Sequence, residues 1–493
     1  MTASSRRTTE SSAGTRPGGG PVPLPTPKFA SAARSALADT GLRRNLRGAT
    51  AEARARTSAA TAEAADWDAL REAGRAIGDA TLLNLDVHLE ELERGVTGAG
   101  GVVHWAVDAA EAREVVTGLV RASGAKEVVK ASSATLREIG LDAALARAGV
   151  TAYETAIADL VVGVGGDEPS HLLSPALHRD RAEIAELFRR TLPAAADLGD
   201  DPAGLAAAAR AHLRDRLLRA RVAVTGANFL VAETGTPVVL ESEGNARMCL
   251  SLPDTLITVA GIDKVVPAWA DLEVFLQLLP RAAGAGPMTP YAASWPGVTP
   301  GDGPRAFHLV LVDNGRTRAL ADEVGRAALR CVRCSACVNV CPVYERTGGR
   351  AYGPVYPGPI GAILTPQLRG VESAADASLP YASTLCGACA DVCPVKIDIP
   401  GVLVHLRGAV VESRRRRPVP TPELALMRGL AWTMGDARRY ETALRRSTRW
   451  ARLLSRGGRI RRLPGLLGKW TEARDLPAPP AESFRAWWAR RRP

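Results

Sequence analysis

The chain has 493 residues, more than one hydrophobic core ordinarily holds, so two or three domains are expected. Apolar residues make up 46% of the sequence, as in globular proteins that fold in water, and no apolar run is long enough to span a bilayer. The net charge of +11 is concentrated in residues 401–493, where 22 Lys and Arg outnumber 7 Asp and Glu, which excludes a uniformly basic protein and indicates a docking surface in the C-terminal region.

The first 28 residues are rich in Ser, Thr, Gly and Pro, a composition that predicts a disordered tail over residues 1–28. Arg6 and Arg7 lie in this tail, but no apolar segment follows them. Neither a secretory nor a twin-arginine export signal is therefore expected, and the protein is predicted to be cytoplasmic.

Residues 29–95 carry apolar side chains at helical spacing, which predicts a group of N-terminal helices. In residues 96–316, short runs rich in Val, Thr and aromatic residues alternate with longer amphipathic runs. The strand candidates are VVHWAV, KEVVKA, VTAYET, VAVTGANFLVAETGTPVVLES, TLITVAGIDKVVP and FHLVLVDNG, and the helix candidates are residues 109–123, 132–149, 179–190 and 205–220. Strands that alternate with helices predict an α/β domain whose parallel or mixed sheet is covered on both sides.

The structure of the remaining segments is predicted from their composition and residue pattern. Gly and Pro are frequent in residues 282–304, which predicts a long loop inside the α/β domain. A cysteine-rich module is expected over residues 320–412, where the pattern of GVLVHLRGAVVES indicates that helices carry its loops. The arginine run 414–417 and the PVPTP that follows mark a further boundary, and residues 413–493 are predicted to form a basic helical region with several tryptophans.

Seven of the eight cysteines lie within residues 331–393. Thiols are kept reduced in the cytoplasm, so this clustering indicates metal ligation rather than disulfides. The first motif is CVRCSACVNVCP, with cysteines at 331, 334, 337 and 341, and the second is CGACADVCP, with cysteines at 386, 389 and 393. In two-cluster ferredoxins the cysteine that precedes Pro in each motif ligates the cluster of the other motif.

This exchange gives a definite ligand assignment. Cluster 1 takes Cys331, Cys334, Cys337 and Cys393, and cluster 2 takes Cys341, Cys386 and Cys389. The position of the absent eighth ligand is Ser383. The second cluster is then either [4Fe–4S], with Ser383, water or another group on the fourth iron, or [3Fe–4S]. Two [4Fe–4S] clusters are the favoured prediction.

Zinc is the alternative occupant, since CxxC pairs also form tetrahedral zinc sites. A zinc site has no use for the third cysteine of the first motif or for two Cys-Pro pairs, so the pattern favours clusters. Cys249 lies apart from the seven in an apolar run and is predicted to be a packed core residue.

The α/β region offers weaker candidates. Glu233 and Arg247 lie near strand-like runs and suggest a small-molecule site, but turn chemistry and a surface ion pair are the favoured explanations. Lys130 precedes two serines at a helix start and suggests an anion site, while Ser is also an ordinary N-cap residue there. His171 and His178 lack metal-ligand companions at suitable spacing and are predicted to be structural.

The sequence resembles the LutB family, the iron–sulfur subunit of the bacterial L-lactate utilisation system, from residue 43 to the C-terminus. The cysteine module carries the resemblance through CVRCSACVNVCPVYERTGGRAYGPVYPGPIGAILTP and LPYASTLCGACADVCPVKIDIP. The α/β region is similar to a LUD domain, a sheet with helices related to CoA transferases and sugar-phosphate isomerases. Its matching segments are ASSATLREIGL, PSHLLSPALHRDRAEIAELF, GANFLVAETGTPVVLESEGNARM and GIDKVVP.

The resemblance implies an electron-transfer subunit of a complex that oxidises L-lactate to pyruvate. The implied partners are a cysteine-rich subunit and a smaller LUD-domain subunit, with no nucleic acid and at most a peripheral membrane contact. Two other functions stay open: the iron–sulfur subunit of a glycolate-type oxidase or heterodisulfide-reductase-like complex, and a LUD-domain transferase or hydrolase with structural clusters.

Overall fold

The computed structural model describes residues 27–192, 199–353, 355–416, 421–472 and 474–491. Residues 1–26, most of the predicted disordered tail, lie outside this part. The chain divides into two compact units at Val410, and each unit is described by itself. The domain boundaries drawn from the sequence stay a prediction.

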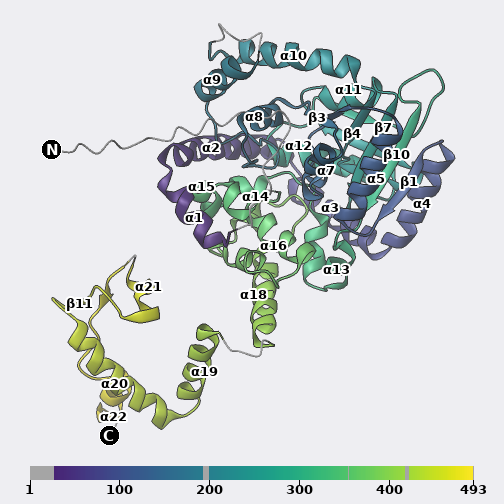
Figure 1. Ribbon diagram of the computed structural model, residues 1–493. Coiled ribbons are helices and arrows are strands. Elements are labelled where there is room, and N and C mark those ends of the chain that lie inside the picture. Colours follow the sequence, from purple (N-terminus) through teal and green to yellow (C-terminus); the bar gives the residue numbers. More distant parts are fainter. Residues whose placement is uncertain (1–26, 193–198, 354, 417–420, 473, 492–493) are drawn as a thin grey trace, which may run out of the picture. The chain divides into compact units, whose positions relative to one another are not determined.

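A six-stranded, wholly parallel sheet forms the centre of the α/β region (Figure 1). Its strand order is β1-β10-β7-β4-β2-β3. The strands are β1 Val102–Ala106, β2 Glu127–Lys130, β3 Thr151–Glu154, β4 Val222–Thr225, β7 Thr255–Gly261 and β10 Ala306–Val312. The α/β class predicted from the alternating pattern is confirmed.

Helices cover both faces of this sheet. Along β10, Leu309 and Leu311 pack on one face with α4 (Leu85–Gly98) and α11 (Asn245–Ser251). Val310 and Val312 pack on the other face. The helices there are α5 (Ala109–Ala122), α6 (Ala134–Glu138) and α7 (Leu141–Arg147). Alternate residues of one strand thus enter two separate cores, as expected of a parallel sheet buried on both sides.

A second sheet of four strands has the order β8-β5-β6-β9. Its strands are β5 Phe229–Val231, β6 Thr236–Glu241, β8 Val265–Val266 and β9 Tyr291–Ser294. Strand β9 lies within residues 282–304, so the prediction of a long loop there was wrong in part. Its side chains are mostly exposed, and its place as an edge strand depends on pairing with β6, which a local pattern does not reveal.

Two further elements differ from the sequence prediction. The helix expected over residues 132–149 is two helices, α6 and α7, because Gly140 between them has a φ of 66°. Helix α8 (Ile157–Gly165) occupies an apolar, glycine-containing run that predicted no helix. It packs with α9 (Arg181–Thr191) and α10 (Pro202–Arg219) in a small separate core.

The N-terminal helices are α1 Phe29–Ala38, α2 Thr40–Ala62, α3 Trp67–Leu83 and α4. Their apolar residues Leu46 and Leu82 share one core with α12 (Trp269–Ala283) and with the cysteine module. This core is continuous through the first unit, so the N-terminal helices, the α/β region and the cysteine module pack as one body.

Within its described residues, the regular secondary structure of the cysteine module is helical. Its α-helices are α13 Arg316–Ala321, α14 Ala336–Asn339, α15 Pro342–Thr347, α16 Gly358–Arg369, α17 Ala388–Asp391 and α18 Ile399–Arg415. Short 3₁₀ turns at Gly325–Arg330, Gly349–Tyr352 and Asp376–Tyr381 connect them. Both cysteine motifs lie in loops that lead into the four-residue helices α14 and α17.

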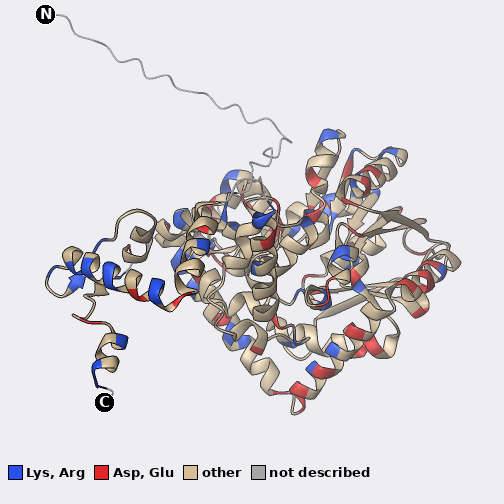
Figure 2. Ribbon diagram, turned by 90° about the horizontal axis from the view of Figure 1, so that it is seen from below, with Lys and Arg blue, Asp and Glu red and all other residues tan. Residues whose placement is uncertain are grey.

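The second unit is rich in arginine, and most of its described residues are helical (Figure 2). They are α19 Pro422–Met434, α20 Ala437–Leu454, α21 Gly468–Thr471 and α22 Phe484–Arg491, with a two-stranded pair of β11 (Arg459–Ile460) and β12 (Leu476–Pro477). Trp432 and Trp450 are exposed within this unit. Within the part of the chain that the structure describes, no helix combines the length and the apolar character needed to cross a membrane.

A buried cation joins the α/β region to the cysteine module. The guanidinium of Arg316 on α13 lies 2.8 and 2.9 Å from the two carboxylate oxygens of Glu138 and 2.5 Å from Asp263. The side chains of Arg316 and Asp263 are each 1% exposed. Burial alone would raise the pKa of Asp263, but the charges of neighbouring cations hold it below its ordinary value.

We expect Arg316→Met to lower the free energy of unfolding by about 3–5 kcal/mol, because it leaves the buried Glu138 without its cation and removes one of the three cations that contact Asp263. The matched control is Arg221→Met, since Arg221 is 72% exposed beside Asp254 and its ion pair contributes at most about 1 kcal/mol. Urea unfolding of the whole chain under anaerobic conditions measures both. Equal losses in the two variants would show that the buried pairing does not stabilise the unit.

Candidate iron–sulfur centre

The first cysteine motif forms a tightly turned loop. Arg333 and Ser335, which flank Cys334, both have a φ of 64°, a conformation uncommon for residues with a side chain. The carbonyl of Cys331 accepts a hydrogen bond of 3.0 Å from Nζ of Lys264, in the turn between β7 and β8. Helix α14 then begins at Ala336 and presents Cys337. A cation of the α/β region therefore fixes the start of the loop.

The second motif repeats this backbone. Leu385 and Gly387 flank Cys386 with φ values of 56° and 86°, and α17 begins at the next residue. The cysteine of each short helix and the cysteine before Pro follow at the same intervals in both motifs. The two loops are thus structural repeats, and Ser383 stands where the first loop has Cys331.

Arginines of the N-terminal helices cap the two short helices in the same way. Arg54 of α2 donates to the carbonyl of Asn339, the last residue of α14, at 2.9 Å. Arg71 of α3 donates to the carbonyls of Ala390 and Cys393, at 3.3 and 2.9 Å. A cation at a helix C-terminus satisfies carbonyls that lack a partner within the helix. The sequence pattern gave no sign of this role.

The seven clustered thiols fall into two groups by their influence on one another. Burial raises the pKa of Cys334, and Cys331 and Cys393 raise it further. Burial likewise raises the pKa of Cys389 to about 12, with contributions from Cys341 and Cys386. The two groups are Cys331, Cys334, Cys337 and Cys393, and Cys341, Cys386 and Cys389.

Backbone amides donate to several of the sulfurs. The N–H of Arg333 lies 3.4 Å from Sγ of Cys331, that of Tyr344 lies 3.5 Å from Cys341, and that of Ile397 lies 3.3 Å from Cys393. Such bonds stabilise negative charge on sulfur. The glycines between the two motifs allow close packing elsewhere in the fold, because a Cβ added at Gly349 would meet the carbonyl of Ser170 and one added at Gly361 would meet that of Tyr356.

The first group of thiols lines a small pocket of about 20 Å³. Its other walls are mostly apolar and include Leu172, Ile360 and Val395. Across the described residues, no three Cys, His, Asp or Glu side chains are placed to hold a single metal ion. Thiols spread around an apolar cavity fit an iron–sulfur core, whose thiolates bind separate irons, whereas zinc draws its ligands to one point.

Two histidines that the sequence suggested to be structural have structural partners. Nε2 of His171 lies 3.1 Å from Oδ1 of Asn339 on α14, and its Nδ1 accepts from the amides of Leu173 and Ser174. Nδ1 of His178 lies 2.9 Å from the hydroxyl of Ser170. His171 therefore braces the loop between Cys337 and Cys341 as a neutral imidazole.

The other candidates of the α/β region are engaged in local contacts. Lys130 is buried and pairs with Asp142 and Glu154, so its charge is matched within the fold. The exposed carboxylate of Glu233 accepts from the amide of Trp269 at 3.2 Å. Arg247 lies 4.6 Å from the ring centroid of Tyr291. Cys249 is buried, which raises its pKa to about 12, so its thiol is inert.

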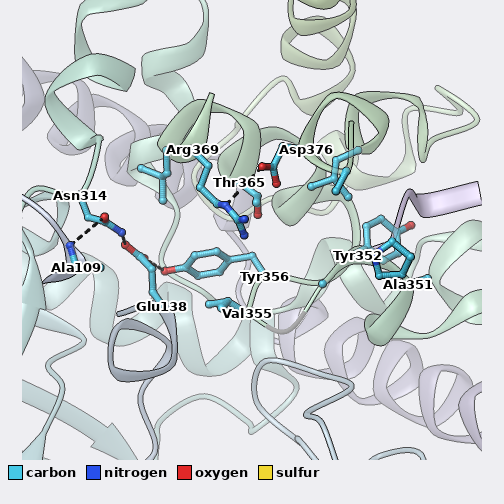
Figure 3. Close-up of a pocket in the computed structure, with 15 residues that line it drawn as sticks. Ala109, Glu138, Asn314, Ala351, Tyr352, Val355, Tyr356, Thr365, Arg369 and Asp376 are labelled. Carbon is cyan, nitrogen blue, oxygen red and sulfur yellow. Dashed lines mark hydrogen bonds and ion pairs between the residues drawn. The ribbon is translucent and has the colours of Figure 1, made fainter. Parts of the chain in front are cut away.

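A larger pocket of about 220 Å³ lies where the α/β region meets the cysteine module (Figure 3). Ala109 and Asn314, which line it, follow the carboxyl ends of β1 and β10, the edge at which α/β proteins bind ligands. Its polar groups already pair, since the Tyr356 hydroxyl donates to Glu138 and Arg369 lies 3.5 Å from Asp376. A ligand here would have to exchange these partners.

Comparison with known families agrees with this architecture. The LUD domain family matches residues 89–312, the 4Fe-4S dicluster domain family matches residues 327–397, and the lactate utilisation protein B C-terminal family matches residues 407–492. The fold and the cysteine module thus define an iron–sulfur protein that joins a LUD domain to a dicluster module.

Curated relatives cover nearly the whole chain. The lactate utilization protein B of Oceanobacillus iheyensis is 41% identical over 87% of this chain and 89% of its own length. Lactate utilization protein B 1 of Bacillus mycoides is 40% identical over 92% and 94%, and the Exiguobacterium protein is 38% identical over 94% and 97%. The chain belongs to the lactate utilization protein B family, which confirms the resemblance seen in its sequence.

A crystal structure of a DUF162 family protein from Deinococcus radiodurans is similar to 46% of this chain and 98% of that chain. The sequence identity is 16% and the TM-score is 0.27, too low to support an argument about the fold.

The pKa of His171 gives a test of its role in bracing the first loop. Burial lowers this pKa to about 4, while an unfolded histidine titrates near 6.5. Between these values the unfolded chain binds a proton that the folded chain does not, so stability falls as the pH falls from about 6.5 towards 4, by up to about 1.4 kcal/mol per pH unit.

We expect His171→Gln to unfold with a shallower loss of stability between pH 6.5 and 5.5 than the unsubstituted chain. Anaerobic thermal melts at both pH values measure the difference. At pH 8 the imidazole of His171 is neutral in both the folded and the unfolded chain, so melts there measure the general cost of the substitution. Parallel pH profiles of the two proteins would contradict a buried neutral His171.

Proposed function

We propose that this chain is the iron–sulfur electron-transfer subunit of a complex that oxidises L-lactate to pyruvate. The observation that carries the proposal is the pair of repeated cysteine loops, each leading into a short capped helix and together gathering seven thiols into two adjacent groups. Iron–sulfur clusters bound there supply one-electron transfer. Lactate as the substrate rests on the names of the curated relatives.

Two [4Fe–4S] clusters are proposed, cluster 1 on Cys331, Cys334, Cys337 and Cys393 and cluster 2 on Cys341, Cys386 and Cys389. The mutual influence of the thiols supports this division, because burial and then thiols of the same group raise the pKa of Cys334 and of Cys389. The charge of Cys389 also raises the pKa of Cys337, so the two groups are neighbours.

The two loops differ in their exposure to solvent, which suggests where a partner subunit docks. The first loop is largely enclosed by the α/β region, while Cys386 and Thr384 of the second loop are exposed. An exposed ligand loop is where an electron-transfer partner can approach within tunnelling distance. We therefore place the contact with a partner at the second loop, and propose a cysteine-rich subunit and a smaller LUD-domain subunit as the companions.

Metal analysis tests the clusters themselves. Anaerobically purified chain is expected to hold about eight irons and as many acid-labile sulfides. Cys334→Ser removes a buried ligand of the first group and should bring the iron content towards about four. Cys249→Ser, a buried cysteine outside both groups, should leave it unchanged. Zinc in place of iron, or no acid-labile sulfide, would falsify the proposal.

An activity assay tests the relay. The chain purified anaerobically with its co-expressed partner subunits should reduce an artificial acceptor when L-lactate is added. The chain alone should not, because an electron-transfer subunit receives its electrons from a partner. Deletion of the gene should abolish growth on L-lactate as the sole carbon source.

The alternatives give different outcomes in the same assays. Oxidation of glycolate but not lactate would indicate a glycolate-type oxidase, and cleavage of a heterodisulfide would indicate a reductase of that class. Turnover by the chain alone that survives Cys334→Ser would indicate a LUD-domain transferase or hydrolase with structural clusters.

A further inference from the structure

We infer that Ser383 supplies the fourth protein ligand of the second cluster, through its side-chain oxygen. This inference rests on the proposed function and completes its ligand set, in which the second group of thiols is one short. The evidence is the likeness of the two loops, position by position, around Cys331 and Ser383.

The backbone places the two residues alike. In the first loop the positive φ values fall two and four residues after Cys331, at Arg333 and Ser335. In the second they fall two and four residues after Ser383, at Leu385 and Gly387. A loop with the same turns at the same intervals directs its first side chain towards the same relative position.

The hydrogen bonds of the two side chains are alike as well. Sγ of Cys331 accepts from the amide of Arg333 at 3.4 Å, and Oγ of Ser383 accepts from the amide of Leu385 at 3.1 Å. In each loop the side-chain acceptor therefore contacts the backbone amide two residues further along the chain. This bond favours negative charge on the acceptor, as an iron ligand requires.

A cation holds the main chain of each residue too. The carbonyl of Cys331 accepts from Lys264 at 3.0 Å, and the carbonyl of Ser383 accepts from Nη2 of Arg407 on α18 at 3.3 Å. Arg407 also donates to the carbonyl of Pro380 at 2.9 Å. Ser383 is thus held at its side chain by the amide of Leu385 and at its carbonyl by Arg407 of α18.

Thr384 is the nearest competing hydroxyl. It is exposed and interacts with Cys386, and it occupies the position of Val332 in the first loop. Val332 carries no ligating atom, so the repeated geometry assigns ligation to Ser383 and not to its neighbour. On binding iron, the Ser383 hydroxyl releases its proton to solvent and its oxygen forms an Fe–O bond. An oxygen ligand is harder than a thiolate, so the second cluster differs chemically from the first.

The test compares Ser383→Ala, Ser383→Cys and the control Thr384→Val, each as the full chain purified anaerobically. The unsubstituted chain should hold about eight irons and give no EPR signal from an oxidised three-iron centre. Ser383→Ala should lose about one iron and gain that signal. Ser383→Cys should keep all irons, give no such signal and shift the reduction potential of one cluster only. Thr384→Val should keep all irons and give no three-iron signal.

Two results would overturn the assignment: Ser383→Ala with a full iron content and no three-iron signal, or the three-iron signal already present in the unsubstituted chain. If Ser383→Ala fails to fold, the potential of Ser383→Cys decides, since an unshifted potential excludes oxygen ligation by this residue. A chain without acid-labile sulfide would instead reject the proposed function, so the two failures are distinguishable.

Discussion

The pairing of Arg316 with Glu138 and Asp263 is the constraint on which the arrangement of this unit depends. A guanidinium removed from water needs its carboxylates in place, and these come from α6 and from the turn after β7. Asp263 extends the pairing, since Lys264 and Arg333 also contact its carboxylate, at 2.9 and 3.4 Å. Because Lys264 holds the carbonyl of Cys331, the same charges that join the two regions also position the first ligand loop.

The LUD domain therefore acts as part of the support of the first loop. Three cations, Arg316, Arg333 and Lys264, face two carboxylates, Glu138 and Asp263, which leaves the surroundings of this loop cationic. Positive charge beside an iron–sulfur centre offsets the charge of its thiolates and favours the reduced state. Among the described residues, no comparable network from the α/β region reaches the second loop, and its cations Arg71 and Arg407 come from α3 and α18. Two repeated loops are thus placed in different electrostatic surroundings.

The sequence predicted the class of fold and the candidate ligands because both depend on short-range patterns. The apolar run that marks β10 and the intervals between the cysteines can each be recognised within a few residues of sequence. Strand β9 and helix α8 were missed, because the first pairs with a distant strand and the second has glycines that disguise its pattern. The residues that hold the loops, such as Lys264 and Arg71, were also missed. Each contacts its loop from 67 or more residues away, and no local spacing marks such a contact.

The positions of the thiols couple the cofactor to the fold. Burial raises the pKa of Cys334, Cys337 and Cys393, and the neighbouring thiols raise it further, so these side chains are protonated when no cation lies among them. Iron binding reverses this balance, because the metal charge replaces the lost hydration and the thiols release their protons. The amides that already point at the sulfurs of Cys331 and Cys393 lower the cost of the ionised state without changing the backbone. The loops are therefore shaped for the charged ligands, and cluster binding stabilises the same core that the α/β region and the N-terminal helices share.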